Sequence, residues 1–349
     1  MQKITGCFLI VCIVESILLS CTTQSNDPYI DLSQSELLDN PVLLFRFNNK
    51  IPIDIAVKDS LAILLFYKED TCGAIYNLNT KEKISSFGIV GNGPGEVTGI
   101  DFLVNKNEAL QKDSICFYDI NQGRLLAASI QPNHHFELQN IRNSPNALYN
   151  SYNQNITDNL MVARSIRDDG YMFFIYNMKN QDIKYIEYYP KIPNLDIRAR
   201  KSTYAPRLAL NEAKGKIIAG MYYLDLIHIY KINGEREKTI YFSKQWMPPV
   251  EKHKIDFRAR HTGSTGIFPT DNYCYLLRRQ LSTVKTAKIV NTHLIQLDWN
   301  GNLIKSYALK GDFVPGLFIH EEQNIMYAIQ INIEADNAEY YDVVKYDLK

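Results

Sequence analysis

Apolar and polar residues alternate along the chain in a repeated pattern that predicts β-hairpins. Each copy has an alternating strand, a polar turn rich in Asn, Asp, Lys and Gly, and a second strand. Such turns are favoured because Asn and Asp bond to their own backbone and Gly accepts a positive φ. The five complete copies are AIYNLNTKEKISSF, ICFYDINQGRLLAAS, FFIYNMKNQDIKYIEY, IHIYKINGEREKTIYF and HLIQLDWNGNLIKSYAL, and a half copy, DVVKYDLK, ends the sequence.

The spacing of these hairpins predicts a β-propeller. Equivalent positions are occupied by Tyr76, Tyr118, Tyr176, Tyr230, Leu297 and Tyr346, with separations of 42, 58, 54, 67 and 49 residues. Such separations are typical of four-stranded propeller blades with loop insertions. The sequence therefore predicts an all-β protein, a six-bladed β-propeller of four-stranded blades.

The expected propeller spans residues 41–349. We expect blades at about 52–90, 97–142, 150–190, 202–244, 257–309 and 313–349, with the hairpin of the second blade one strand earlier than in the others. The last blade has three strands of its own, and an unpaired sheet edge needs covering. PVLLFRFNN, at 41–49, has the alternation of an outer strand. An N-terminal strand is therefore expected to close the ring.

The first 20 residues have the layout of a signal peptide. Lys3 precedes an apolar stretch from Phe8 to Leu19, which is too short for a membrane span. LLSC, ending at Cys21, resembles a bacterial lipobox, and this resemblance implies cleavage after residue 20 and lipidation of Cys21. Residues 21–40 would then form a lipidated tether, with DLSQSELLDN as a short helix candidate at best. A plain secretory signal with a chance cysteine is the alternative.

A glycine-rich loop, GIVGNGPGEVTG, separates the first two expected blades. A dinucleotide fingerprint requires G-x-G-x-x-G at the start of a helix. Counted from Gly91 or Gly93, the sixth residue is Glu96 or Thr98, and the following residues alternate like a strand. We interpret the loop as a structural crossing between blades, formed by Gly91, Gly93, Pro94, Gly95 and Glu96.

The lipobox, the hairpin series and this loop together resemble a known family. Phe87-Gly88 followed by Gly93-Pro94-Gly95-Glu96 is similar to the end of the first blade in the TolB-like six-bladed propeller lipoproteins of Bacteroidetes. The resemblance covers nearly the whole mature chain. It implies export and lipid anchoring to the outer membrane, on its periplasmic face or at the cell surface, but it implies no reaction.

Composition and motifs indicate few specific partners. The 38 basic and 38 acidic side chains balance, so nothing favours nucleic acid, and the membrane would be contacted only through the lipid anchor. The histidines, among them His228, His253, His261 and His293, suggest no catalytic triad. No metal, cofactor or catalytic residue is assigned, and we expect a monomer.

An arginine series in the third to fifth blades is the candidate binding site. Arg164, Arg207 and Arg278 fall in the inner halves of their blades, as do Tyr222 and Tyr223. Inner strands surround the central channel of a propeller, so we expect these side chains to converge there. Arginine and tyrosine suit an anionic or polyhydroxylated ligand. The alternative is that each arginine pairs with a nearby carboxylate.

The most consistent function is an exported lipoprotein with a binding or scaffolding domain. Its partner would be a small molecule or a protein at one mouth of the channel. The alternative is a propeller enzyme, a lyase or hydrolase acting on a sugar or lactone in the central channel.

Overall fold

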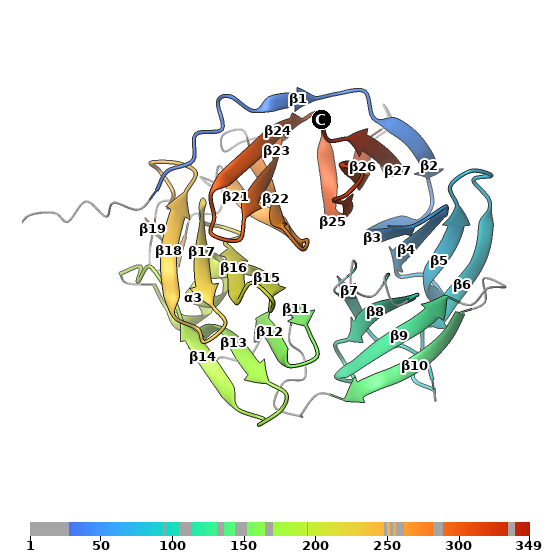
Figure 1. The fold of residues 1–349 in the computed structure, drawn as a ribbon, viewed down its shortest axis with the longest axis horizontal. Helices are drawn as coiled ribbons and strands as arrows, with labels where there is room; N and C mark the ends of the chain where they lie inside the picture. Colours follow the sequence, from blue (N-terminus) through green and yellow to red (C-terminus); the bar gives the residue numbers. More distant parts are fainter. Residues whose placement is uncertain are drawn as a thin grey trace, which may run out of the picture.

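The chain forms a ring of six blades, each built on an antiparallel sheet, as Figure 1 shows for the computed structural model. The structure describes residues 28–349 except 94, 105, 107–109, 111–112, 131–135, 144–151, 165–169, 194, 248–249, 252–253, 256–261, 282–288 and 334–338. The predicted all-β, six-bladed propeller is confirmed. No helix in the described part of the chain has the length and apolar character needed to cross a membrane.

Blades 1 to 3 each contain four strands that run outward from the centre in sequence order. Blade 1 contains β3 (Ile51–Lys58), β4 (Leu61–Tyr67), β5 (Thr71–Asn77) and β6 (Lys83–Ile89). Blade 2 contains β7 (Ile100–Val104), β8 (Ser114–Asp119), β9 (Arg124–Ile130) and β10 (Phe136–Asn143). Blade 3 contains β11 (Tyr152–Ile156), β12 (Leu160–Arg164), β13 (Tyr171–Asn177) and β14 (Ile183–Glu187).

Blades 4 to 6 follow the same order. Blade 4 contains β15 (Arg207–Asn211), β16 (Lys216–Gly220), β17 (Leu226–Lys231) and β18 (Arg236–Tyr241). Blade 5 contains β21 (Thr262–Pro269), β22 (Tyr273–Leu281), β23 (Ile289–Asp298) and β24 (Leu303–Leu309). Blade 6 contains β25 (Asp312–His320), β26 (Ile325–Ile333) and β27 (Glu339–Asp347). Helix α3 (Ile197–Tyr204) precedes blade 4, and a two-strand ladder of β19 (Val250–Glu251) and β20 (Lys254–Ile255) precedes blade 5.

The repeated hairpins of the sequence join the third and fourth strands of blades 1, 3, 4 and 5. In blade 2 the hairpin joins β8 and β9, the second and third strands, as expected. Gly234 and Gly301 have φ values of 81° and 77° in the outer turns of blades 4 and 5, a conformation that glycine adopts without steric strain.

The hydrophobic core lies between neighbouring blades. In β4 (LAILLFY), six consecutive residues are buried because both faces of the strand pack against other parts of the ring. Separate apolar clusters unite blades 3 and 4, blades 4 and 5, and blades 5 and 6. Side chains between blades are therefore positioned by two sheets.

An N-terminal strand closes the ring. β2 (Val42–Phe47) pairs antiparallel with β27 and completes blade 6 as its outermost strand. Phe45 of β2 is 7% exposed, and Arg46 donates two hydrogen bonds to Asp342, at 2.8 and 3.0 Å. The predicted closure by residues 41–49 is confirmed.

Residues 28–40, which we call the strap, run along the outside of blades 4 and 5 before β2 begins (Figure 1). Ile30 N–H donates to the Tyr241 carbonyl at 2.9 Å, and Tyr241 N–H donates to the Pro28 carbonyl at 3.1 Å. Further on, β1 (Glu36–Leu38) pairs in parallel with β24. The short helix considered for residues 31–40 is therefore wrong, and residues 28–40 of the expected tether pack on the propeller.

Candidate functional site

The predicted site residues lie at one face of the propeller, where the innermost strands begin. Arg164 ends β12, Arg207 begins β15, and Arg278 lies near the end of β22. Tyr222 and Tyr223 occupy the connection from β16 to β17. All five therefore lie on or beside the first or second strands of blades 3, 4 and 5.

The structure brings only some of these residues together. The Arg207 guanidinium lies 5.5 Å from the centre of the Tyr222 ring, which in turn lies 4.7 Å from the Tyr223 ring. Arg278 instead lines a pocket between blades 4 and 5, which neither Arg164 nor Arg207 lines. Binding of one ligand by all five residues stays a prediction.

Arg278 forms a buried ion pair with Asp225 of the neighbouring blade. Nε and Nη2 of Arg278 lie 2.7 and 2.8 Å from the two carboxylate oxygens, and the two side chains are 7% and 2% exposed. The backbone holds Asp225 in place, because its N–H donates to the Trp246 carbonyl and its carbonyl accepts from Phe242 N–H. Such a forked pair fixes both position and orientation.

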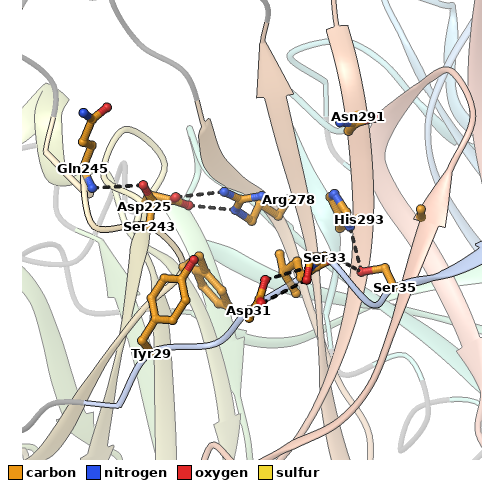
Figure 2. Close-up of a pocket in the computed structure, with 13 residues that line it drawn as sticks. Tyr29, Asp31, Ser33, Ser35, Asp225, Ser243, Gln245, Arg278, Asn291 and His293 are labelled. Carbon is orange, nitrogen blue, oxygen red and sulfur yellow. Dashed lines mark hydrogen bonds and ion pairs between the residues drawn. The ribbon is translucent and has the colours of Figure 1, made fainter.

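This ion pair forms part of the wall of a pocket of about 640 Å³. A pocket of that size is large enough for a small molecule. The strap contributes Tyr29, Asp31, Leu32, Ser33 and Ser35; blade 4 and its following loop contribute Asp225, Phe242, Ser243 and Gln245; and blade 5 contributes Arg278, Asn291, His293 and Ala308. Figure 2 shows Arg278 directed at Asp225, while the strap crosses below them and reaches His293 through Ser35.

Most residues of the strap between Tyr29 and Ser35 face the pocket. Tyr29, Asp31, Leu32, Ser33 and Ser35 line it, whereas Ile30 is 7% exposed and packs into the core between blades 4 and 5. A turn at residues 33–34 is closed by a hydrogen bond from Ser35 N–H to the Leu32 carbonyl at 3.2 Å. The strap therefore forms one wall of the pocket and is held on the propeller by the buried side chain of Ile30.

His293 of β23 meets the strap through Ser35. Its Nδ1 lies 3.1 Å from Ser35 Oγ. Ser35 Oγ donates its proton to the Leu32 carbonyl at 2.8 Å and lies 2.9 Å from Ser306 Oγ. Ser35 therefore accepts from Nδ1–H, and Nε2 is left as an acceptor with no partner among the described residues. Burial, reinforced by the charge of Arg278, lowers the pKa of His293 to about 4, so the ring is neutral at neutral pH.

Near the centre of the ring, a second buried ion pair has a structural role. Lys106 Nζ pairs with Asp54 and donates to the carbonyls of Ile55, at 2.9 Å, and Leu317, at 2.7 Å. The other Asp54 oxygen accepts from Leu103 N–H at 2.8 Å. All three ammonium protons are thus used in joining blades 1, 2 and 6, and this cluster offers no open group to a ligand.

The glycine-rich loop connects β6 to β7 and folds around its own carboxylate. Glu96 accepts from Gly93 N–H at 2.5 Å, and a Cβ added at Gly91 would clash with that carboxylate. Glu96 therefore occupies the space that a bound anion would need. Gly95 has a φ of 82°, and Pro94 lies outside the described residues. The described residues of the loop lie between the last strand of blade 1 and the first strand of blade 2.

The sequence analysis named Arg278 as a candidate, gave His293 no role in a site, and did not single out Asp225 or the strap. The signal for the strap was present in PYIDLSQS, where Ile30 and Leu32 alternate with polar residues inside a segment that we assigned to a tether. Cys21 lies outside the described residues, so its lipidation stays a prediction. The described residues contain no group of three or more metal-ligating side chains suited to a metal ion.

The fold and this pocket define a class, a six-bladed β-propeller with a polar pocket between two blades. No protein-family model matches the sequence, and a search of curated proteins finds no relative. Among solved structures, a candidate exported protein from Bacteroides fragilis is similar, with a TM-score of 0.51, 11% identity, and coverage of 92% of this chain and 100% of that one. A member of the DUF4221 family from Bacteroides vulgatus has a TM-score of 0.49 and 11% identity, covering 89% of this chain and 99% of that one.

The similarity to the Bacteroides fragilis protein supports the propeller fold and no more. That match covers 92% of this chain and 100% of the other, so the fold is shared over most of both chains. At 11% identity, however, side chains of a site are not carried over. Membership of the TolB-like lipoprotein family stays a prediction.

Proposed function

We propose that the chain is an exported, lipid-anchored binding protein that holds a small polar ligand in the pocket between blades 4 and 5. The observation that carries this proposal is the pocket itself, where Arg278 and Asp225 are fixed by a buried fork and the imidazole of His293 is positioned by Ser35. Polar groups held in place before binding lose little freedom when a ligand arrives. A pocket built in this way suits recognition.

Export and anchoring are supported by the N-terminal sequence. The signal-like residues 1–20 and the lipobox ending at Cys21 precede the strap, with residues 22–27 between them. Seven residues from Cys21 to Pro28 span at most about 25 Å. A lipid on Cys21 would therefore hold the outer edge of blade 4, and the pocket beside it, close to the membrane surface.

A hydrolase acting on a sugar or lactone is the second candidate, and the contact between Ser35 and His293 favours it. The 3.1 Å separation is within reach of proton transfer. However, the Ser35 proton is directed at the Leu32 carbonyl, and the lowered pKa of His293 makes it a weak base. We therefore rank binding above catalysis. Covalent labelling of Ser35 by a fluorophosphonate would reverse this order.

The proposed binding function is tested by thermal-shift screening of the folded chain against fractionated small molecules from a bacterial extract. We expect at least one polar fraction to raise the melting temperature of the wild type. Ser33→Trp, which places an indole in the pocket, should lose that response. Gln34→Trp is the matched control, because the neighbouring exposed Gln34 does not line the pocket. A response that survives in Ser33→Trp, or no response from any fraction, would count against the pocket as the binding site.

A further inference from the structure

The charges of the pocket do not balance. Arg278 and Asp225 neutralise each other through their fork, and His293 is neutral at physiological pH. Among the described lining residues, this leaves Asp31 of the strap as the one uncompensated charge. The described lining of the pocket is therefore negative in sum, although an arginine lies in its wall.

Asp31 is held in position and stays ionised. Its carboxylate accepts a hydrogen bond from Ser33 N–H at 2.9 Å and another from the Ser33 hydroxyl at 3.0 Å. These bonds lower the pKa of Asp31. The carboxylate keeps lone pairs for a ligand, because each of its oxygens accepts one of these bonds.

An aromatic ring lies beside this carboxylate. Tyr29 comes two residues earlier on the same side of the extended strap, and 52% of its surface is exposed. Figure 2 shows both side chains on the pocket side of the strap. A carboxylate next to an aromatic face attracts ammonium groups, through charge and through the negative face of the ring.

The far side of the pocket offers a different kind of group. His293 is 8% exposed, and its Nε2 is an acceptor without a partner among the described residues. An acceptor in a largely buried position is satisfied by a ligand hydroxyl. Ser243, which also lines the pocket, provides a further hydroxyl.

From this arrangement we propose that the pocket takes a small polyhydroxylated amine, such as a free amino sugar. Its ammonium group lies against Asp31 and Tyr29, and one of its hydroxyl groups donates to His293 Nε2. This inference rests on the proposed binding function of the same pocket. The proposed ligand is cationic, whereas Arg164, Arg207 and Arg278 suggested an anionic or polyhydroxylated ligand from the sequence.

The test compares three sugars that differ mainly in charge, with D-glucosamine as the amine, D-glucose as the neutral analogue and D-glucuronate as the anion. Isothermal titration calorimetry on the wild-type chain should give at least tenfold tighter binding of glucosamine than of glucose, and the weakest binding for glucuronate. Asp31→Asn should remove the preference for glucosamine and leave glucose binding little changed. Asp39→Asn is the control, because Asp39 is an exposed acid of the same strap outside the pocket.

The second variant, His293→Phe, tests the hydroxyl contact at His293 separately from the ammonium contact at Asp31. It should weaken glucosamine and glucose to a similar extent and preserve the ratio between them. Equal or tighter binding of glucose or glucuronate in the wild type would overturn the inference, as would an unchanged ratio in Asp31→Asn. Failure of all three sugars to bind would also overturn it, whereas the proposed binding function is decided separately by the extract screen.

Discussion

Arg278 of blade 5 and Asp225 of blade 4 join their blades through two parallel hydrogen bonds, at 2.7 and 2.8 Å. Both side chains are almost fully buried. The fork is at once a contact between blades and part of the wall of the pocket. We therefore expect stability and the proposed ligand binding to depend on the same two side chains.

Breaking this pair from one side should be strongly destabilising. We expect Arg278→Leu to lower the free energy of unfolding by about 3–5 kcal/mol, because it leaves a buried carboxylate without its partner. The double variant Arg278→Leu/Asp225→Leu should recover most of that loss. Urea denaturation followed by circular dichroism measures both.

The control for this experiment is Arg46→Leu. Arg46 forms the same kind of fork with Asp342, but its side chain is 46% exposed. An exposed pair contributes about 1 kcal/mol or less. Equal losses in Arg46→Leu and Arg278→Leu would show that burial does not set the strength of the pair between blades 4 and 5.

The closing strand supplies a second prediction. Phe45 is buried and lies 5.2 Å from the Tyr76 ring, so Phe45→Ala should lower the free energy of unfolding by about 3–5 kcal/mol. Val42 is 56% exposed on the same strand, and Val42→Ala should change stability by about 0.5 kcal/mol or less.

Deletion of residues 41–49 should abolish cooperative melting or cause aggregation, because it exposes the edge of β27. A deleted chain that melts like the intact one would show that β2 is not needed for closure.

A buried histidine in blade 4 should make the fold sensitive to acid. His228 Nε2–H donates to the Tyr189 carbonyl at 2.8 Å, and Nδ1 lies 2.9 Å from Thr239 Oγ1, which also accepts from Arg236. Burial lowers the pKa of His228 to about 3, against an ordinary value of 6.5. Between these values the unfolded chain binds the extra proton and the folded chain does not. Stability therefore falls as the pH drops below 6.5.

The size of this loss of stability follows from the linkage between protonation of His228 and unfolding. At pH 5 this single group lowers the free energy of unfolding by about 2 kcal/mol relative to pH 7. His228→Gln keeps one donor and one acceptor but does not titrate, so its melting temperature should fall less than that of the wild type between pH 7 and pH 5. Identical pH profiles for the two proteins would contradict the role assigned to His228.

The lipid anchor is tested at Cys21. Cys21→Ala should release the protein from the membrane fraction and abolish incorporation of labelled palmitate, since the acylated residue is gone. Absence of label in the parent protein, together with unchanged membrane association of the variant, would exclude lipidation at this position.

The sequence allowed the ring to be predicted because each hairpin is a local signal. Alternation and turn residues lie within about 15 positions of one another, and Phe45 and Phe47 marked the closing strand in the same way. The pocket could not be predicted in this manner. Asp225 is 53 positions from Arg278, and Ser35 is 258 positions from His293. The first pair is set by the packing of blade 4 against blade 5 and the second by the packing of the strap on blade 5, and no local pattern encodes either contact.

The strap was missed for a related reason. Its paired strand, β1, has only three residues, and its register is determined by β24 on the far side of the sequence. Ile30 and Leu38 are buried by the strap's contact with the ring and resemble scattered apolar residues when read alone. A polar segment with isolated buried residues is hard to distinguish from a flexible tether.

The most direct test of the proposed binding site is a crystal structure of a complex. The ligand in that complex should be the compound that gives the largest increase in melting temperature. We predict ligand density between blades 4 and 5, in contact with the strap at Asp31 and with His293, beside an unbroken Arg278–Asp225 fork. Ligand density at another place, such as the channel face near Arg207 and Tyr222 with the pocket between blades 4 and 5 unoccupied, would contradict it.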